Sequence, residues 1–216
     1  MEYTLVFLPL LGSIISGFFG RYIGDRNSEI VTSLFVSISA ALSLIIFYQV
    51  IVNSYENNLI IATWMNSGLL DVNWSIKVDT LSSVMLVVVC LVSSIVHIYS
   101  IGYMSHDPHK TRFMAYLSLF TFAMLMLVTS DNFLQLFFGW EGVGLCSYFL
   151  IGFWFKKDSA NAAAIKAFIV NRVGDFGFAL GIFLIFYVFG TVNYDEVFSQ
   201  IPQSINKEIS FLGMNL

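Results

Sequence analysis

The chain has 216 residues, of which 57% are hydrophobic and only 11% are charged, whereas ordinary soluble domains have about 25% charged residues. So few polar side chains cannot cover a water-facing surface, and the composition therefore excludes a soluble globular domain. The formal net charge of −4 is small and scattered, and no basic patch of the kind that binds nucleic acid is present. These properties predict a polytopic protein of the lipid bilayer.

Three apolar runs and one polar segment make up the first half of the chain. We interpret the first run as a retained membrane span rather than a signal peptide, because it lacks a basic n-region and an A-x-A cleavage site. Residues 72–78 alternate between apolar and polar side chains, which is the period of a strand, and we expect a small β-hairpin on the membrane surface at about 53–79. Membrane spans are expected at about residues 3–20, 30–52 and 80–103.

Three further spans are expected in the second half, at about residues 112–130, 132–155 and 162–189. Asp131 and Asn132 form a tight turn before the fifth span, and Asn132 is a good helix cap. The remaining residues, 191–216, have mixed character and predict an amphipathic segment on the surface, with another apolar patch at 209–216. The sequence therefore predicts an all-α polytopic membrane protein of about six transmembrane helices with one small extramembrane hairpin.

The basic residues of the connections indicate an orientation. Six of them follow spans one, three and five, and two lie on the opposite side, at Lys77 and Lys207. Because cytoplasmic connections carry an excess of Lys and Arg, we expect the amino terminus to lie away from the cytoplasm or the mitochondrial matrix. The six residues are Arg21, Arg26, Lys110, Arg112, Lys156 and Lys157.

Three ionisable residues lie where lipid is expected. Glu141 is near the middle of the fifth span, among the glycines of residues 139–152, and Asp175 is near the middle of the sixth. The two spans run antiparallel, so both carboxyl groups are expected at a similar depth. Arg172 and Asp175 are spaced i,i+3 and share one helix face. Because a charge inside the bilayer costs at least a few kcal/mol unless it is paired, hydrated or neutralised, we interpret these residues as a candidate proton-relay site.

Two other residues are weaker candidates for the same relay. Lys166 is about two and a half turns from Asp175 and so points to another side of the helix, while His97 is a titratable group within the third span. Ser147, Tyr148 and Asn171, together with internal water, could carry protons between the ionisable groups. The alternative interpretation is a charged cluster that only locks helices together.

The sequence predicts no metal or cofactor site. Cys90 and Cys146 are far apart in apolar runs, without a CxxC motif. His106, Asp107 and His109 surround a proline in a connection, and we interpret them as a solvated loop.

The residues around Glu141 carry a resemblance to a known family. Residues 138–154 (FGWEGVGLCSYFLIGFW), residues 166–175 (KAFIVNRVGD), residues 78–82 (VDTLS) and residues 97–104 (HIYSIGYM) resemble the signatures of chain 5 of NADH:quinone oxidoreductase, respiratory complex I. The similarity runs over nearly the whole chain, from the first span to the tail.

The resemblance implies an antiporter-like membrane subunit that couples quinone reduction elsewhere in the complex to proton translocation. It implies two inverted repeats of five helices, of which residues 111–216 would begin the first and residues 1–110 would flank it. It also implies partner subunits in the membrane that surround this chain, and no redox centre within it. NADH, FMN, iron–sulfur clusters and quinone would bind in the partners.

The family's fifth-helix glutamate, matched here by Glu141, is proposed to pair with a lysine of a seventh helix, and Arg172 and Asp175 match sixth-helix residues of the same channel. The sequence ends at Leu216, before that lysine, so we expect an amino-terminal fragment of a longer product rather than a split subunit, with an incomplete antiporter-like bundle. The large subunit of a multisubunit Na⁺/H⁺ antiporter and a structural membrane scaffold remain as alternatives.

Overall fold

The computed structural model describes residues 1–68, 70–204, 210–211 and 214–215. Six of its helices, α1 to α6, are long and apolar enough to cross a membrane, so the prediction of an all-α polytopic membrane protein is confirmed. The elements in chain order are α1 Glu2–Ile23, α2 Asp25–Asn53, β1 Asn57–Ser67, β2 Leu70–Val78, α3 Thr80–Tyr103, α4 Lys110–Val128, α5 Phe133–Ile151, α6 Asp158–Phe189, α7 Tyr194–Ser204, β3 Ser210–Phe211 and β4 Met214–Asn215.

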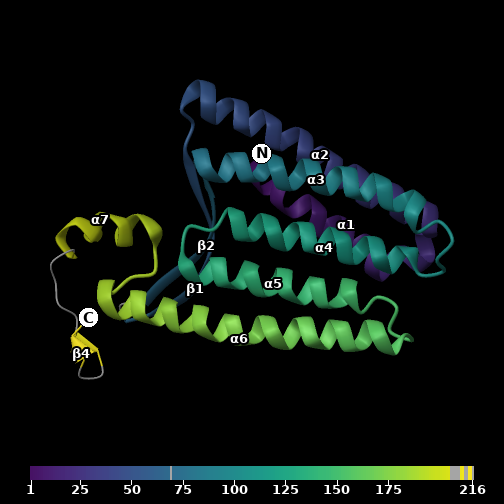
Figure 1. Cartoon of the computed structure of the whole chain (residues 1–216). Coiled ribbons are helices and arrows are strands. Elements are labelled where there is room, and N and C mark those ends of the chain that lie inside the picture. Colours follow the sequence, from purple (N-terminus) through teal and green to yellow (C-terminus); the bar gives the residue numbers. More distant parts are fainter. Residues whose placement is uncertain (69, 205–209, 212–213, 216) are drawn as a thin grey trace.

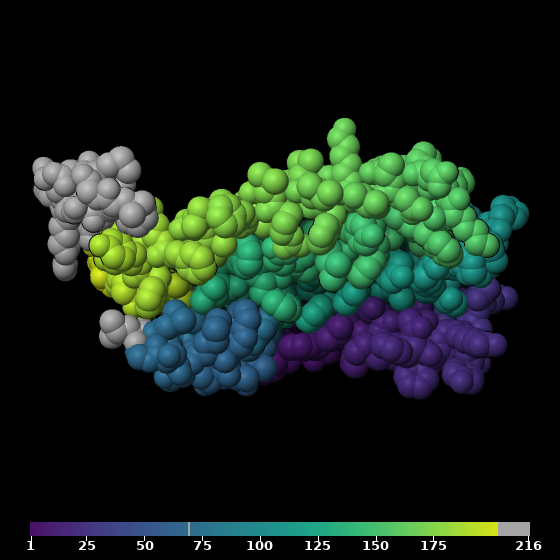
Figure 2. Space-filling model, turned by 90° about the horizontal axis from the view of Figure 1, so that it is seen from below, coloured from purple at the N-terminus to yellow at the C-terminus, as the bar shows by residue number. Residues whose placement is uncertain are grey.

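The helices lie side by side with their axes roughly along one direction, and the connections that follow α1, α3 and α5 gather at one end (Figure 1). The β1–β2 hairpin and α7 lie at the other end. Helices α1 to α4 pack against one another, α5 packs on α4, and α6 packs on α5. Figure 2 shows this order as colours that run from purple at one long edge of the molecule to yellow-green at the other. Helix α6 is therefore an edge helix and is the least buried of the six.

The main apolar core lies between α1, α2, α3 and α4, and the hairpin closes it at one end. Side chains of β2 enter this core together with those of the helices, which explains why one face of that strand is apolar. The fully buried members of this core include Leu5, Val6, Ile46, Ile76, Leu86, Cys90 and Leu125.

The hairpin pairs β1 with β2 in antiparallel register, and Gly68 at its turn has a φ of 61°, a region that suits glycine. The hairpin prediction is confirmed. The capping prediction for Asn132 is also confirmed, because its side-chain oxygen accepts a hydrogen bond from the Gln135 N–H.

Several expected boundaries are wrong by a few residues. Helices α1 and α2 continue into the charged segment, and Gly24 alone separates them, because its φ of 87° turns the chain. Helix α5 ends at Ile151, before residue 155, and α6 begins at Asp158, before residue 162. Hydropathy marks the lipid-facing stretch, but a helix continues into polar residues wherever its backbone bonds are satisfied. The expected tail contains α7, and half of the apolar patch expected at 209–216 lies outside the described residues.

Candidate functional site

The start of α5 is fixed by the hairpin. The Gln135 side chain is fully buried, accepts a hydrogen bond from the Ser75 N–H at 2.9 Å and donates one to the Ser75 carbonyl at 2.6 Å. Asn132 donates to the Asn73 carbonyl at 3.0 Å, and Phe138 packs edge-on against Trp74 with ring centroids 4.7 Å apart. These contacts set the position and rotation of α5 about its own axis.

Two glycines then bring α5 close to α4. A Cβ on Gly139 would lie 2.7 Å from the Leu127 Cα, and one on Gly142 would lie 3.1 Å from the Ala123 Cβ. Both glycines therefore face α4 rather than α6, and the α4 backbone comes close to α5 at Gly139. Gly144 has open space beside it among the described residues.

The third contact of α5 is an ion pair with α6. Glu141 Oε1 accepts a hydrogen bond from Arg172 Nη1, and the same nitrogen lies 3.8 Å from Asp175 Oδ2. The side chains of Glu141 and Asp175 are 23% and 8% exposed, whereas that of Arg172 is 47% exposed and stacks on the Phe168 ring. The structure thus joins the three candidate residues, with one guanidinium between two carboxylates.

Asp175 has a second partner. The indole N–H of Trp140 donates to Asp175 Oδ1 at 2.8 Å. A cavity of about 740 Å³ between α4, α5 and α6 reaches this bond, and Ser147 and Asn171 line it together with apolar side chains. The sequence predicted polar roles for Ser147 and Asn171 but gave no signal for Trp140, because an aromatic ring in a membrane span is usually a packing residue.

The remaining relay candidates lie elsewhere. Lys166 is exposed on α6 and forms no ion pair with any residue of the described ranges. His97 is fully buried between α3 and α4. Its Nδ1 is 2.8 Å from the Ser93 carbonyl, so Nδ1 carries the proton, and Nε2 faces the Ser118 hydroxyl at 3.4 Å. The structure does not bring either residue into contact with Glu141.

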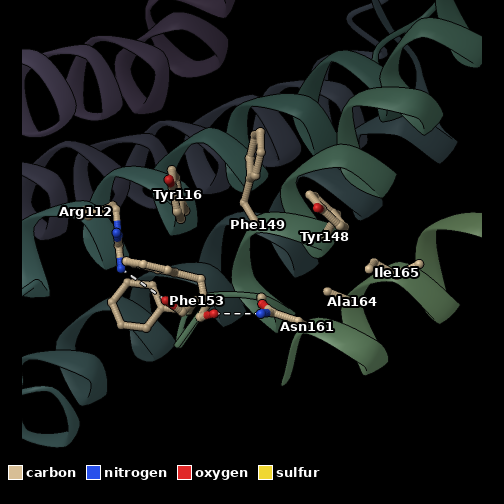
Figure 3. A pocket seen from close by; sticks show the side chains of 10 residues that line it. Arg112, Tyr116, Tyr148, Phe149, Phe153, Asn161, Ala164 and Ile165 are labelled. Carbon is tan, nitrogen blue, oxygen red and sulfur yellow. Dashed lines mark hydrogen bonds between the residues drawn. The ribbon is translucent and has the colours of Figure 1, made fainter. Parts of the chain in front are cut away.

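Tyr148 lies at a second cavity, of about 340 Å³, nearer the end of the molecule where α5 connects to α6 (Figure 3). Arg112 donates to the Phe153 carbonyl at 3.1 Å beside this cavity, and Asn161 donates to the Phe155 carbonyl at 2.6 Å. Tyr148 is two helical turns from Glu141 on α5. This cavity is therefore a candidate water-filled entrance at the end of the molecule where α5 connects to α6.

Asp107 belongs to the connection between α3 and α4, outside the membrane-spanning helices. Partial burial raises the pKa of Asp107, but hydrogen bonds from the Trp154 indole and the His109 N–H, together with the nearby charges of His109 and Arg112, lower that pKa below its ordinary value. The carboxylate of Asp107 is therefore held by hydrogen bonds within the protein.

Comparison with known proteins identifies the family. A model described as the amino terminus of chain 5 of NADH-ubiquinone oxidoreductase (complex I) matches residues 64–114, and one described as the membrane domain of NADH:quinone oxidoreductase and Mrp antiporters matches residues 130–216. The chain is 57% identical to NADH-ubiquinone oxidoreductase chain 5 of Triticum aestivum over 216 residues. The chain belongs to the complex I chain 5 family.

A bacterial relative matches the chain to a similar extent. NADH-quinone oxidoreductase subunit L of Rickettsia bellii is 52% identical over 205 residues, which are 95% of this chain and 32% of that protein. The Triticum match covers 100% of this chain and 32% of the relative, so the chain spans about a third of the length of the curated relatives it matches.

Solved structures share the fold at low sequence identity. The Mrp complex of Dietzia has a subunit that aligns with a TM-score of 0.76 and 23% identity, over 91% of this chain and 20% of that one. The archaeal membrane-bound sulfane sulfur reductase aligns with a TM-score of 0.78 and 16% identity, over 91% and 39%. The helical arrangement is therefore that of antiporter-like membrane subunits.

Proposed function

We propose that the protein to which this chain belongs is a proton-translocating membrane subunit of NADH:quinone oxidoreductase. The observation that carries the proposal is Arg172, which is bonded to Glu141 and lies within 4 Å of Asp175. Two carboxylates share one cation near the middle of two adjacent membrane helices. Relatives named NADH-ubiquinone oxidoreductase chain 5 match the whole of this chain, and they support the choice of complex.

The arrangement supports proton transfer through the cost of an unpaired charge in the membrane. While Arg172 pairs with Glu141, the Glu141 carboxylate is compensated. If Arg172 moves to Asp175, Glu141 is left without a cation, and an uncompensated charge at this depth costs at least about 2.5 kcal/mol. Uptake of a proton by Glu141 removes that cost, and return of Arg172 releases the proton. Movement of the Arg172 guanidinium between two carboxylates is thus enough to couple a conformational change to the uptake and release of one proton.

We further propose that the redox cofactors, namely NADH, FMN, iron–sulfur clusters and quinone, bind in partner subunits and none binds in this chain. The membrane partners would be other complex I subunits, and protons and internal water would be what this chain handles. Charge movement by carboxylates needs no redox centre within the chain, which supports this division of labour.

A second candidate is the large subunit of a multisubunit Na⁺/H⁺ antiporter, because the model that matches residues 130–216 is described for both kinds of protein. The two are separated by purifying the full-length protein with its partners from its own membranes. Flavin and iron–sulfur absorbance with NADH-driven quinone reduction would support the complex I subunit. A colourless complex that exchanges Na⁺ for protons and lacks that activity would overturn it.

We also propose that the connections after α1, α3 and α5 face the cytoplasm or the mitochondrial matrix, in a bacterial or mitochondrial inner membrane. The six basic residues counted above support this side. The test uses Ser105→Cys and Glu56→Cys, which are exposed at opposite ends of the molecule, since Cys90 and Cys146 are buried. An impermeant thiol reagent on the cytoplasmic or matrix side should label the first variant only, and the reverse pattern would contradict the orientation.

A further inference from the structure

Trp140 and Glu141 are consecutive on α5, and the side chains of both residues contact α6. Consecutive helical residues are rotated by about 100° about the axis, so the two side chains reach α6 along different flanks. Glu141 binds Arg172, and Trp140 binds Asp175, three residues further along α6. The two bonds together hold both members of the Arg172–Asp175 pair from the neighbouring helix.

The hydrogen bond from Trp140 determines which carboxylate oxygen of Asp175 is left to face Arg172. Oδ1 accepts the indole N–H at 2.8 Å, and Oδ2 is left facing Arg172 at 3.8 Å, too far for a hydrogen bond. Arg172 is meanwhile hydrogen-bonded to Glu141. Among the residues that the structure describes, Asp175 has no other side-chain partner. Without the indole N–H, the buried carboxylate would have Arg172 alone to compensate it.

We propose that Trp140 is a positioning residue that holds Asp175 as the distant partner of Arg172 and so leaves the guanidinium on Glu141. This inference rests on the proposed function. The Trp140 side chain is 50% exposed, and its ring contacts Phe178 of α6 edge-on, with ring centroids 6.0 Å apart. The contact of Trp140 with the charged pair itself is the directional N–H bond. When the N–H is lost, Arg172 shifts toward Asp175 and Glu141 loses its cation in the resting state.

The test separates the effect of the aromatic ring of Trp140 from the effect of its N–H donor. Trp140→Phe keeps an aromatic ring without the N–H. Trp140→Gln removes the ring but keeps an N–H donor the same number of bonds from Cβ. The control is Trp154→Phe, which removes an indole N–H that donates to Asp107 in the α3–α4 connection at 2.9 Å. Each change is made in the full-length protein within its complex. The rate of proton translocation, over a range of pH, and the number of protons translocated per NADH oxidised are measured in sealed vesicles.

Trp140→Phe should lower the rate of translocation roughly tenfold, the effect of one hydrogen bond to a charged group, and should shift its pH profile. Trp140→Gln should retain most of the rate, and Trp154→Phe should leave it unchanged. Equal function of Trp140→Phe and the wild type, or better function of Phe than of Gln, would overturn the inference. If Trp140→Phe does not assemble, the Gln variant decides alone, because a low rate there contradicts a role for the donor.

Asp175→Asn completes a double-mutant cycle. If Trp140 acts through Asp175, then Trp140→Phe adds no further loss to Asp175→Asn, whereas multiplicative losses would assign Trp140 to packing only. Glu141→Gln is measured in parallel. Normal pumping in that variant would overturn the proposed function itself, while a defect in Glu141→Gln beside normal pumping in Trp140→Phe would overturn only the role of Trp140.

Discussion

Arg172 on α6 is hydrogen-bonded to Glu141 on α5, although Asp175 lies one turn away on its own helix. The interhelical partner thus takes the closer contact, and Asp175 is held at a longer distance by Trp140. This division of one cation between two helices depends on the rotation of α5, which its contacts with α4 and with the hairpin determine.

The close approach of α4 and α5 predicts that Gly139→Ala is destabilising. The new Cβ would lie 2.7 Å from the Leu127 Cα and 2.8 Å from its nitrogen, and backbone atoms cannot move aside cheaply. We expect a loss of about 1–3 kcal/mol, typical of overpacking, measured as a lower thermal midpoint of the purified full-length protein. Gly144→Ala is the matched control, because no described atom beyond its own stretch of α5 lies within 4 Å of its added Cβ. Equal midpoints for the two variants would contradict the packing account.

The anchor between the hairpin and α5 predicts a cost for Gln135→Leu. The change keeps the approximate volume of the side chain but leaves the buried Ser75 N–H and carbonyl without their partner. Each unpaired buried group costs about 1–3 kcal/mol, so a clear drop in thermal midpoint is expected. Asp195→Asn removes the Lys77 ion pair at the same end, where Asp195 is 69% exposed, and should change stability little. A larger effect from Asp195→Asn would show that the ion pair is the anchor.

His97 offers a test of relay against packing. His97→Asn keeps an N–H donor near the position of Nδ1, so the bond to the Ser93 carbonyl can form, while His97→Leu removes both polar contacts. Since His97 lies between α3 and α4, away from the Glu141 pair, we expect the Asn variant to retain proton translocation and the Leu variant to lose stability. Complete loss of translocation in an assembled, stable Asn variant would instead show that a titratable group is needed there.

The contact between Asp107 and Trp154 predicts a local dependence on pH. Because the pKa of Asp107 is lowered in the folded protein, its contact stabilises the fold fully above the ordinary value of 3.8 and is lost as the pH falls through the lower folded value. Hydrogen exchange of residues 104–112 should therefore accelerate in acid relative to the Trp154→Phe variant, which lacks the contact at every pH. A ratio of the two proteins' exchange rates that stays constant across the acid range would contradict this prediction.

Much of the fold follows from local patterns in the sequence. Hydropathy gives six spans, strand period gives the hairpin, and the polar cap gives the start of α5. The spacing of Arg172 and Asp175, with the antiparallel order of the last two spans, places their side chains near the depth of Glu141. These are all properties of one segment or of two neighbouring segments.

Contacts that depend on helix rotation could not be predicted. Which flank of α5 meets α6 is determined by Gly139 and Gly142 packing on α4, so the sequence alone does not pair Trp140 with Asp175. The bond between Gln135 and Ser75 joins residues 60 positions apart through the docking of the hairpin. Single-glycine turns such as Gly24 also shifted helix ends, because hydropathy does not report backbone dihedral angles.

The central claim, that Glu141 binds and releases the translocated proton, is tested most directly by Glu141→Gln in the full-length protein within its complex. The amide keeps the size of the side chain and can still contact Arg172, but it cannot bind or release the proton. The matched control is Glu56→Gln, an exposed position outside the helices. The measurement is the number of protons translocated per NADH oxidised in sealed vesicles, with assembly checked by the amount of intact complex. The account predicts a ratio well below that of the wild type and of the control; a wild-type ratio in assembled Glu141→Gln complex would contradict it.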